Sequence, residues 1–242
     1  GLGDVYKRQI LLFNKNNVQS IDFSIFESEY KMLKNKNSVD TSSKVLNSID
    51  TWKKTIYPKS DGQNKYIQAV NEYDVIFGLG PAGTGKSYLA VAKAVQSLKK
   101  GLIDKIILSR PAVEAGENLG FLPGDMKDKV DPYLRPIYDA LYEMMPFETV
   151  EKKIQEGIIE IAPVAFMRGR TFKNSFIIID EAQNTSSIQM KMILTRLGYG
   201  SKMIINGDLT QIDIKYINDS GLSTAKKKLS NLKTVSYTHL TL

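Results

Sequence analysis

Residues 80–87 carry the residue types whose chemistry is easiest to interpret. They form the run Gly80-Pro81-Ala82-Gly83-Thr84-Gly85-Lys86-Ser87, which fits the pattern G-x-x-x-x-G-K-[ST]. Glycines in such a run allow backbone N–H groups to turn inward around phosphate oxygens. Lys86 offers a mobile positive charge to the β- and γ-phosphates of ATP, and Ser87 offers a hydroxyl to Mg²⁺. The run predicts a phosphate-binding loop, against the alternative of a chance glycine-rich turn.

Two carboxylates follow the apolar run at residues 176–179. They are Asp180 and Glu181. Ligands of parallel α/β sheets bind at the carboxyl ends of strands, so both side chains are expected beside the phosphate loop. Asp180 is predicted to hold Mg²⁺ through its water shell. Glu181 is predicted to orient or deprotonate an attacking water. The alternative is that the pair only caps the helix that follows.

Two glutamines are weaker candidates for the same site. Gln211 ends the run 206–211, which follows another apolar stretch, and it is predicted to contact the γ-phosphate or its water. The alternative for this run is a simple Gly-Asp turn. Gln63 lies seventeen residues before Gly80 and is predicted to use both sides of its amide on an adenine edge. The alternative for Gln63 is an exposed linker residue.

Other arginines and tyrosines leave the choice between function and packing open. Contact with phosphate or nucleic acid, or else a surface ion pair, is expected for Arg110, Arg168 and Arg170. Packing in the core, rather than stacking on bases, is expected for Tyr133, Tyr138 and Tyr142, because aromatic residues at helical spacing usually pack.

The elements that must position these residues alternate between strands and helices. Strands are expected at residues 75–77, 105–109, 158–161, 176–179 and 203–205. Helices are expected after Ser87, around residues 137–145 and after Thr185. The last of these is expected to turn Ile188, Met192 and Leu197 inward. Alternation of this kind predicts an α/β fold with a mostly parallel sheet and helices on both faces.

Composition narrows the classes of protein and of chemistry. Of the 242 residues, 42% are apolar and 24% are charged, which is typical of a soluble globular protein. No apolar run approaches the roughly 18 residues of a membrane span, so no membrane partner is expected. There is no cysteine, which excludes disulfides and thiol catalysis and fits a cytoplasmic location. The net charge of +7 is compatible with nucleic-acid binding and equally with solvated lysines.

The chain is expected to divide into four parts. Residues 1–9 and 235–242 resemble adaptor sequence translated in frame, so they are predicted to be a foreign leader and a foreign tail. Residues 10–60 are polar and are predicted to be a short lead-in or linker. Residues 61–234 are predicted to be the nucleotide-binding domain.

An ordered set of short motifs resembles the PhoH-like family of P-loop ATPases. Besides the phosphate loop, the matching segments lie at residues 110–117, 120–125, 131–136, 168–171, 180–184, 194–198, 207–213 and 220–222. The family is similar to the first RecA-like domain of superfamily 1 helicases. The resemblance implies a RecA-like P-loop NTPase fold and ATP hydrolysis with Mg²⁺. It also implies a ring-shaped homo-oligomer such as a hexamer, and a link to RNA or single-stranded nucleic acid.

One departure from the family affects the expected activity. The family continues past residues 220–222 with a strand and a basic element that reaches the γ-phosphate, whereas this chain runs into its predicted tail after about residue 234. The domain is therefore expected to be truncated, with the trigger for hydrolysis missing. Two alternatives to a simple ATPase stay open: an RNA-dependent helicase, and a nucleotide-binding scaffold that does not hydrolyse ATP.

Overall fold

The computed structural model describes residues 47–111, 126–211, 220–229, 232 and 234–241, with side chains of residues 126–133 and 162 excepted. The predicted leader at residues 1–9, most of the predicted lead-in, the motif at residues 120–125 and the side chain of Tyr133 lie outside this part of the chain.

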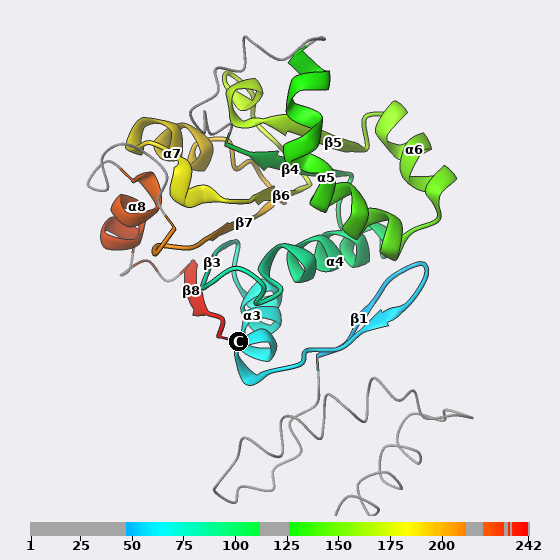
Figure 1. Cartoon of the computed structure of the whole chain (residues 1–242), viewed down its shortest axis with the longest axis horizontal. Coiled ribbons are helices and arrows are strands. Elements are labelled where there is room, and N and C mark those ends of the chain that lie inside the picture. Colours follow the sequence, from blue (N-terminus) through cyan, green and yellow to red (C-terminus); the bar gives the residue numbers. More distant parts are fainter. Residues whose placement is uncertain (1–46, 112–125, 212–219, 230–231, 233, 242) are drawn as a thin grey trace, which may run out of the picture.

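Helices and strands alternate through the described chain, as the sequence predicts (Figure 1). The strands are β1 (Ile49–Asp50), β2 (Thr55–Ile56), β3 (Val75–Leu79), β4 (Lys105–Arg110), β5 (Ile159–Pro163), β6 (Ser175–Ile179), β7 (Lys202–Gly207) and β8 (Val235–His239). The α-helices are α3 (Asp61–Glu72), α4 (Lys86–Lys99), α5 (Met126–Met144), α6 (Phe147–Gln155), α7 (Ser187–Leu194) and α8 (Gly221–Leu229). Two short 3₁₀ helices, η2 (Val164–Met167) and η3 (Ala182–Asn184), complete the set.

The six-stranded sheet has the order β5-β4-β6-β7-β3-β8, and all of its neighbouring strands are parallel. The strand before the phosphate loop, β3, is separated from the strand before the carboxylate pair, β6, by β7. This order aligns the carboxyl ends of β3, β7, β6 and β4 along one edge of the sheet. The predicted RecA-like P-loop fold, α/β with a parallel sheet, is confirmed.

Each face of the sheet packs against its own layer of helices. Alternate strand residues such as Ile76, Leu108 and Ile178 are buried against α3, α4 and α5. Their neighbours, such as Phe77 and Ile177, are buried on the other face, in a cluster with residues of η2, α7 and α8. The strands are continuously apolar because helices cover both faces of the sheet. Within the described residues, none of the helices is long and apolar enough to span a bilayer.

The inward face of α7 differs from the prediction. The helix begins at Ser187 because Ser186 and Gln189 form a capping box, and this start turns Met190 and Ile193 into the core. Ile188 is 83% exposed, so its predicted inward orientation is wrong. Met192 and Leu197 do pack partly against the core, but Leu197 lies beyond the end of the helix at Leu194.

The segment before the phosphate-loop domain contributes to the core, which the sequence did not indicate. Strands β1 and β2 form an antiparallel hairpin, with Ile49 paired to Ile56. Both isoleucines are buried in the same cluster as the residues of α4. The exposed side chain of Lys99 on α4 donates a hydrogen bond to Asp50 (2.8 Å). Residues 47–56 therefore pack on the domain and are not a free linker.

Substituting Ile49 tests this packing. Ile49→Ala is expected to lower the free energy of unfolding by about 2–5 kcal/mol, because a fully buried side chain leaves a cavity. The exposed neighbour provides the control, since Ser48→Ala is expected to change stability by less than about 0.5 kcal/mol. Urea unfolding followed by circular dichroism measures both, and equal midpoints for the two variants would contradict the packing.

The last strand was also missed. Residues 235–242 entered the fold prediction only as a foreign tail, yet Val235–His239 forms β8, which pairs in parallel with β3 from Val75 to Leu79. Tyr237 stacks on Phe77 with ring centroids 4.8 Å apart, and Leu240 is buried. These residues complete the edge of the sheet beside the phosphate-loop strand.

Candidate functional site

The residues singled out from the sequence meet at one edge of the sheet. The phosphate loop follows β3, Asp180 and Glu181 follow β6, and the run that ends at Gln211 follows β7. Arg110 ends β4. Residues of the phosphate loop line a cavity of about 440 Å³ together with Asp180, Glu181 and Gln211. This is within the roughly 300–1,000 Å³ typical of small-molecule sites.

The backbone of the phosphate loop takes conformations that favour glycine. Gly80, Gly83 and Gly85 have φ angles of 149°, 79° and 85°, a region that side chains with a Cβ rarely adopt. Gly85 is the N-cap of α4 and provides no side-chain hydrogen bond to the helix. The first N–H groups of α4 and the positive end of its dipole are therefore directed at the loop, as an anion site requires.

Lys86 lies inside the loop. Its Nζ donates to the carbonyl oxygens of Gly80 and Pro81, both at 2.7 Å. Burial lowers the pKa of Lys86, while the negative charges of Asp180, Asp208 and Glu181 act in the opposite direction. The ammonium is thus a partly desolvated cation surrounded by acidic groups. Phosphate oxygens in the loop are natural additional acceptors for its N–H groups.

Ser87 and Asp180 are brought together across the sheet edge. The Ser87 hydroxyl donates to Asp180 Oδ1 at 2.5 Å, and Asp180 is 5% exposed. Burial raises the pKa of Asp180, and the hydrogen bond from Ser87 opposes that shift. A hydroxyl and a carboxylate in contact match the hard oxygen ligands that Mg²⁺ prefers.

Asp208 adds another oxygen to this part of the site. Its Oδ1 accepts hydrogen bonds from the backbone N–H and the hydroxyl of Thr210, whereas its Oδ2 is buried and has no hydrogen-bond partner. No group of three or more acidic or histidine ligands occurs within the described residues. The residues therefore fit a Mg²⁺ ion that keeps much of its water shell, with Ser87 and Asp180 as its protein contacts.

Glu181 has an unusual backbone conformation. Its φ is 52° and its ψ is 39°, the left-handed region, which is uncommon for residues other than glycine. One carboxylate oxygen lies 3.3 Å from Arg110, and the other accepts a 2.6 Å hydrogen bond from Gln183. Strained backbones of this kind persist only where the surroundings hold them, and they cluster at functional sites. Glu181 is the N-cap of the 3₁₀ helix that follows but makes no side-chain capping hydrogen bond, and Asp180 and Glu181 both line the cavity.

The two predicted glutamines have different surroundings. Gln211 is exposed and lines the cavity, and its backbone N–H closes a turn onto Asp208. The turn is observed, and the predicted contact of Gln211 with the γ-phosphate or its water stays a prediction. Gln63 is half-buried in α3, which excludes the exposed-linker alternative. Its amide donates to Thr84 O (3.0 Å) and accepts from Lys59 N (2.6 Å). It supports the back of the loop, and its predicted contact with adenine stays a prediction.

A buried polar pair lies beneath the loop. The Tyr66 hydroxyl donates to Asn206 Oδ1 at 2.7 Å, and both residues are fully buried. The same hydroxyl lies 3.5 Å from the carbonyl oxygen of Lys86. Burial raises the pKa of Tyr66, so the phenol is neutral. The pair links α3 to the end of β7 and to the start of α4.

Removing this hydroxyl is expected to destabilise the domain. Tyr66→Phe leaves Asn206 Oδ1 without its donor, which costs about 1–3 kcal/mol for a buried acceptor. Thermal unfolding by calorimetry measures the loss. Tyr199→Phe is the matched control, because Tyr199 is 88% exposed. Equal transition temperatures for the two variants would show that the hydrogen bond does not contribute.

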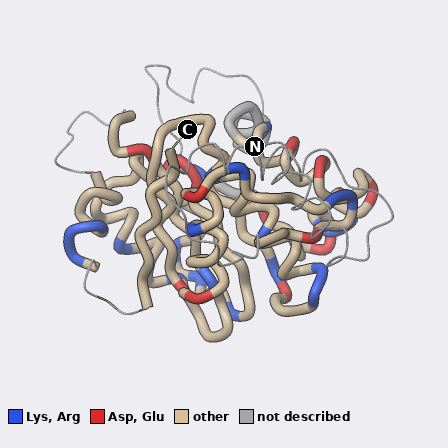
Figure 2. Tube along the Cα trace, turned by 90° about the horizontal axis from the view of Figure 1, so that it is seen from below, with Lys and Arg blue, Asp and Glu red and all other residues tan. Residues whose placement is uncertain are grey.

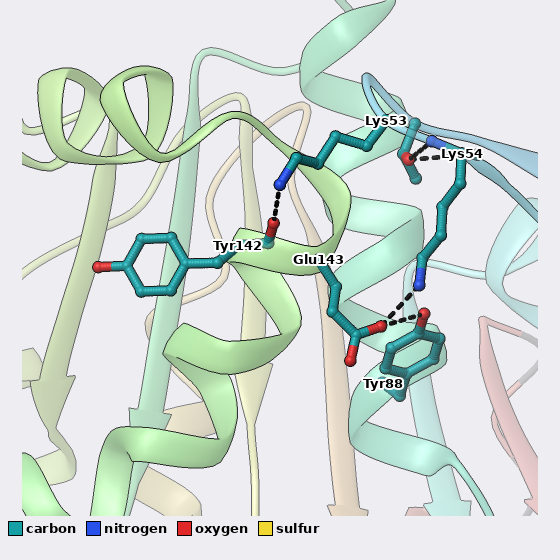
Figure 3. A network of polar contacts seen from close by, with 6 residues as sticks. Lys53, Lys54, Tyr88, Tyr142 and Glu143 are labelled. Atoms are coloured by element: carbon teal, nitrogen blue, oxygen red, sulfur yellow. Dashed lines mark hydrogen bonds and ion pairs between the residues drawn. The ribbon is translucent and has the colours of Figure 1, made fainter.

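Helix α5 forms the wall of the cavity opposite the strand ends. Its residues Ile137, Ala140 and Glu143 line the cavity together with Tyr88 of α4. Glu143 Oε2 accepts hydrogen bonds from Lys54 (2.6 Å) and from Tyr88 (3.0 Å), as Figure 3 shows. These two hydrogen bonds lower the pKa of Glu143.

The hairpin also holds the C-terminal end of α5. Lys53 donates from its side chain to Tyr142 O at 2.7 Å (Figure 3). Its backbone N–H donates to Met144 O at 3.0 Å. The last turn of α5 has no basic residue of its own, so the two hairpin lysines supply the positive charge that a helix C-terminus favours. No local sequence pattern indicates this contact, because Lys53 and Tyr142 lie 89 positions apart.

The structure shows what surrounds the remaining predicted arginines and tyrosines. Arg110 pairs with Glu181, and Arg170 forms a bidentate pair with Glu160, so the ion-pair alternative holds for both. Arg168 is exposed. Tyr138 and Tyr142 pack against the core, as predicted.

Comparison with known proteins shows to which family the chain belongs. Residues 55–242 match the family described as PhoH-like protein. The chain belongs to this family. It is 58% identical over 187 residues to a "PhoH-like protein" of Bacillus subtilis (strain 168), which covers 77% of the chain and 59% of that protein.

Other relatives give the same result at greater distance. The identity is 54% over 188 residues to a "PhoH-like protein" of Mycobacterium tuberculosis (strain ATCC 25618 / H37Rv), covering 78% of the chain and 53% of that protein. It is 44% over 175 residues to "Protein PhoH" of Escherichia coli (strain K12), covering 72% of the chain and 49% of that protein. The chain thus spans about half to three-fifths of the length of these relatives. The family resemblance predicted from the motifs is confirmed.

Proposed function

We propose that this PhoH-like chain binds ATP with Mg²⁺ and hydrolyses it. The observation that supports this most directly is the contact between Ser87 and Asp180 at 2.5 Å, beside Lys86 and with Glu181 in the same cavity. One site then contains a phosphate loop, a contact for Mg²⁺ and a carboxylate that can orient a water molecule. No further domain is needed to assemble these groups.

The roles of the residues follow from their positions. Backbone N–H groups of the loop bind phosphate oxygens, and Lys86 turns its ammonium from the carbonyl oxygens of Gly80 and Pro81 to the β- and γ-phosphates. Ser87 and Asp180 hold Mg²⁺, which, when bound, neutralises charge on the phosphates. Glu181 orients the attacking water and accepts its proton. Gln211 lines the cavity and is a candidate donor to that water.

Phosphate release in the presence of ATP and Mg²⁺ tests this function. We expect turnover that stops when Mg²⁺ is removed by a chelator, with ATP binding followed in parallel by calorimetry. Binding without turnover would favour the non-hydrolysing scaffold instead. Absence of both would overturn the proposal.

We propose RNA as the partner of this chain. The chain carries a net charge of +7, and the last turn of α8 contains Lys226, Lys227 and Lys228. Figure 2 shows basic and acidic positions interspersed along the rest of the trace. If RNA binds, it is expected to stimulate turnover, and the stimulation should fall as salt increases. Turnover that RNA leaves unchanged at low salt would remove the RNA-dependent alternative.

Light scattering on the same samples tests the proposed ring-shaped homo-oligomer.

A further inference from the structure

The side chain of Gln183 connects two strand ends within the candidate site. It is 1% exposed and belongs to η3, directly after β6. Its Nε2 donates to Glu181 Oε2 at 2.6 Å, and its Oε1 accepts from the backbone N–H of Asp208 at 3.1 Å. One amide therefore joins the carboxylate that follows β6 to the backbone that follows β7.

The sequence of β7 leaves space for this amide. A Cβ on Gly207 would lie 2.9 Å from Gln183 Oε1 and 2.5 Å from Leu222 Cδ2. Both distances are shorter than Cβ contacts normally allow. Any larger residue at position 207 would have to displace the Gln183 amide or the leucine. The close packing of Gln183 on the end of β7 thus depends on a glycine at that position.

Glu181 needs such support more than an ordinary surface glutamate does. Its backbone is in the left-handed region, and its side chain is 35% exposed at the cavity. Gln183 and Arg110 contact different oxygens of the carboxylate and together fix its rotation. A carboxylate has about four lone-pair sites, so two donors leave acceptor sites for a water molecule.

The backbone of the turn is held by other bonds. Asn184 N donates to Glu181 O, and Thr185 N donates to Ala182 O, both at 3.1 Å. Ser220 donates its hydroxyl to Gln183 O, also at 3.1 Å. Replacing only the side chain of Gln183 should therefore leave the turn folded.

We propose that Gln183 is a positioning residue that holds the Glu181 carboxylate in place for hydrolysis by tying it to the end of β7. This inference rests on the proposed function and adds to it. Gln183 is 1% exposed and is not among the described residues that line the cavity. Its effect on hydrolysis is transmitted through the Glu181 carboxylate, so kinetic coupling to Glu181 distinguishes this role from a purely structural one.

Two variants isolate the two hydrogen bonds. Gln183→Met keeps the approximate volume and loses both bonds. Gln183→Glu keeps an acceptor for Asp208 N but removes the donor to Glu181 and places a like charge beside it. For both, kcat is expected to fall on the order of 10- to 100-fold, the scale of misplacing a catalytic group by about 1 Å. The Kd for ATP with Mg²⁺ is expected to stay unchanged. Gln155→Met on α6, an exposed position, is the control.

A measurement that needs no turnover accompanies the kinetics. Hydrogen exchange at the amide of Asp208 is expected to accelerate in Gln183→Met and to stay slow in Gln183→Glu. Unchanged exchange in Gln183→Met would show that the bridge to β7 does not exist and would overturn the inference.

A double-mutant cycle with Glu181→Gln tests the route of the effect. Adding Gln183→Met to Glu181→Gln is expected to cause no further loss of residual turnover. An equal loss in both backgrounds, or unchanged kcat in Gln183→Met alone, would overturn the inference while leaving the proposed function intact. A parent chain that binds ATP with Mg²⁺ but does not turn it over would overturn both.

Discussion

Replacing Lys86 with alanine is expected to weaken ATP binding by roughly 10- to 100-fold in Kd. The Nζ of Lys86 is the cationic group inside the loop, and a charge-assisted hydrogen bond contributes about 1.5–3 kcal/mol. Calorimetric titration with ATP and Mg²⁺ measures the change. The fold should survive, because the variant removes a desolvated cation and leaves the glycine conformations of the loop intact.

The control for Lys86→Ala removes an equal charge elsewhere. Lys65 is exposed on α3, so Lys65→Ala lowers the net charge of the chain by the same amount without touching the loop. It is expected to bind ATP like the parent. An unchanged Kd in Lys86→Ala, with normal thermal unfolding, would show that the loop does not bind the phosphates.

The parts of the site that the sequence predicts are those set by neighbouring residues. The glycine pattern at residues 80–87, between an apolar run and a helix, defines a loop whose geometry is almost entirely local. Asp180 and Glu181 directly follow an apolar run that clearly predicts a buried strand. Since parallel strands end at the same edge, their meeting with the loop follows from the α/β alternation.

The parts that escaped prediction depend on contacts between distant residues. Gln183 lies in the matching segment at residues 180–184, but its contact with the end of β7 depends on the distant Gly207 and could not be predicted. Ile49 is buried, but the apolar residues around it, Val45, Leu46, Trp52 and Ile56, do not alternate with polar ones, so the sequence does not mark a strand there. Asp208 could have been predicted as a site residue, because it follows an apolar strand as Asp180 does. In the structure Asp208 lines the same cavity, and its Oδ2 is buried.

The error at Ile188 has a local cause. The inward face of α7 was predicted only from the spacing of its apolar residues. This spacing is compatible with more than one starting residue for the helix. The capping box between Ser186 and Gln189 fixes the start of the helix and hence which residues face the core. A helix of only two turns contains too few apolar residues for the spacing to correct such a choice.

Glu181→Gln is expected to leave ATP binding near normal and to lower turnover about 10²–10⁴-fold, the contribution typical of a positioned general base. The substitution keeps the shape of the side chain and an oxygen for the Gln183 amide, and removes the negative charge that pairs with Arg110. Single-turnover phosphate release and calorimetric titration on the same samples separate the two effects.

The neighbouring carboxylate provides the comparison that makes this test specific. Asp180→Asn changes the residue that contacts Ser87, so it is expected to weaken ATP binding mainly by raising the concentration of Mg²⁺ required. Glu181→Gln should show the parent's Mg²⁺ dependence, because the Glu181 carboxylate interacts with Arg110 and Gln183, whereas the Ser87 hydroxyl donates to Asp180. Parent-like turnover in both variants would place the chemistry outside this cavity. The reverse pattern, with Mg²⁺ dependence altered by Glu181→Gln alone, would exchange the roles assigned to the two carboxylates.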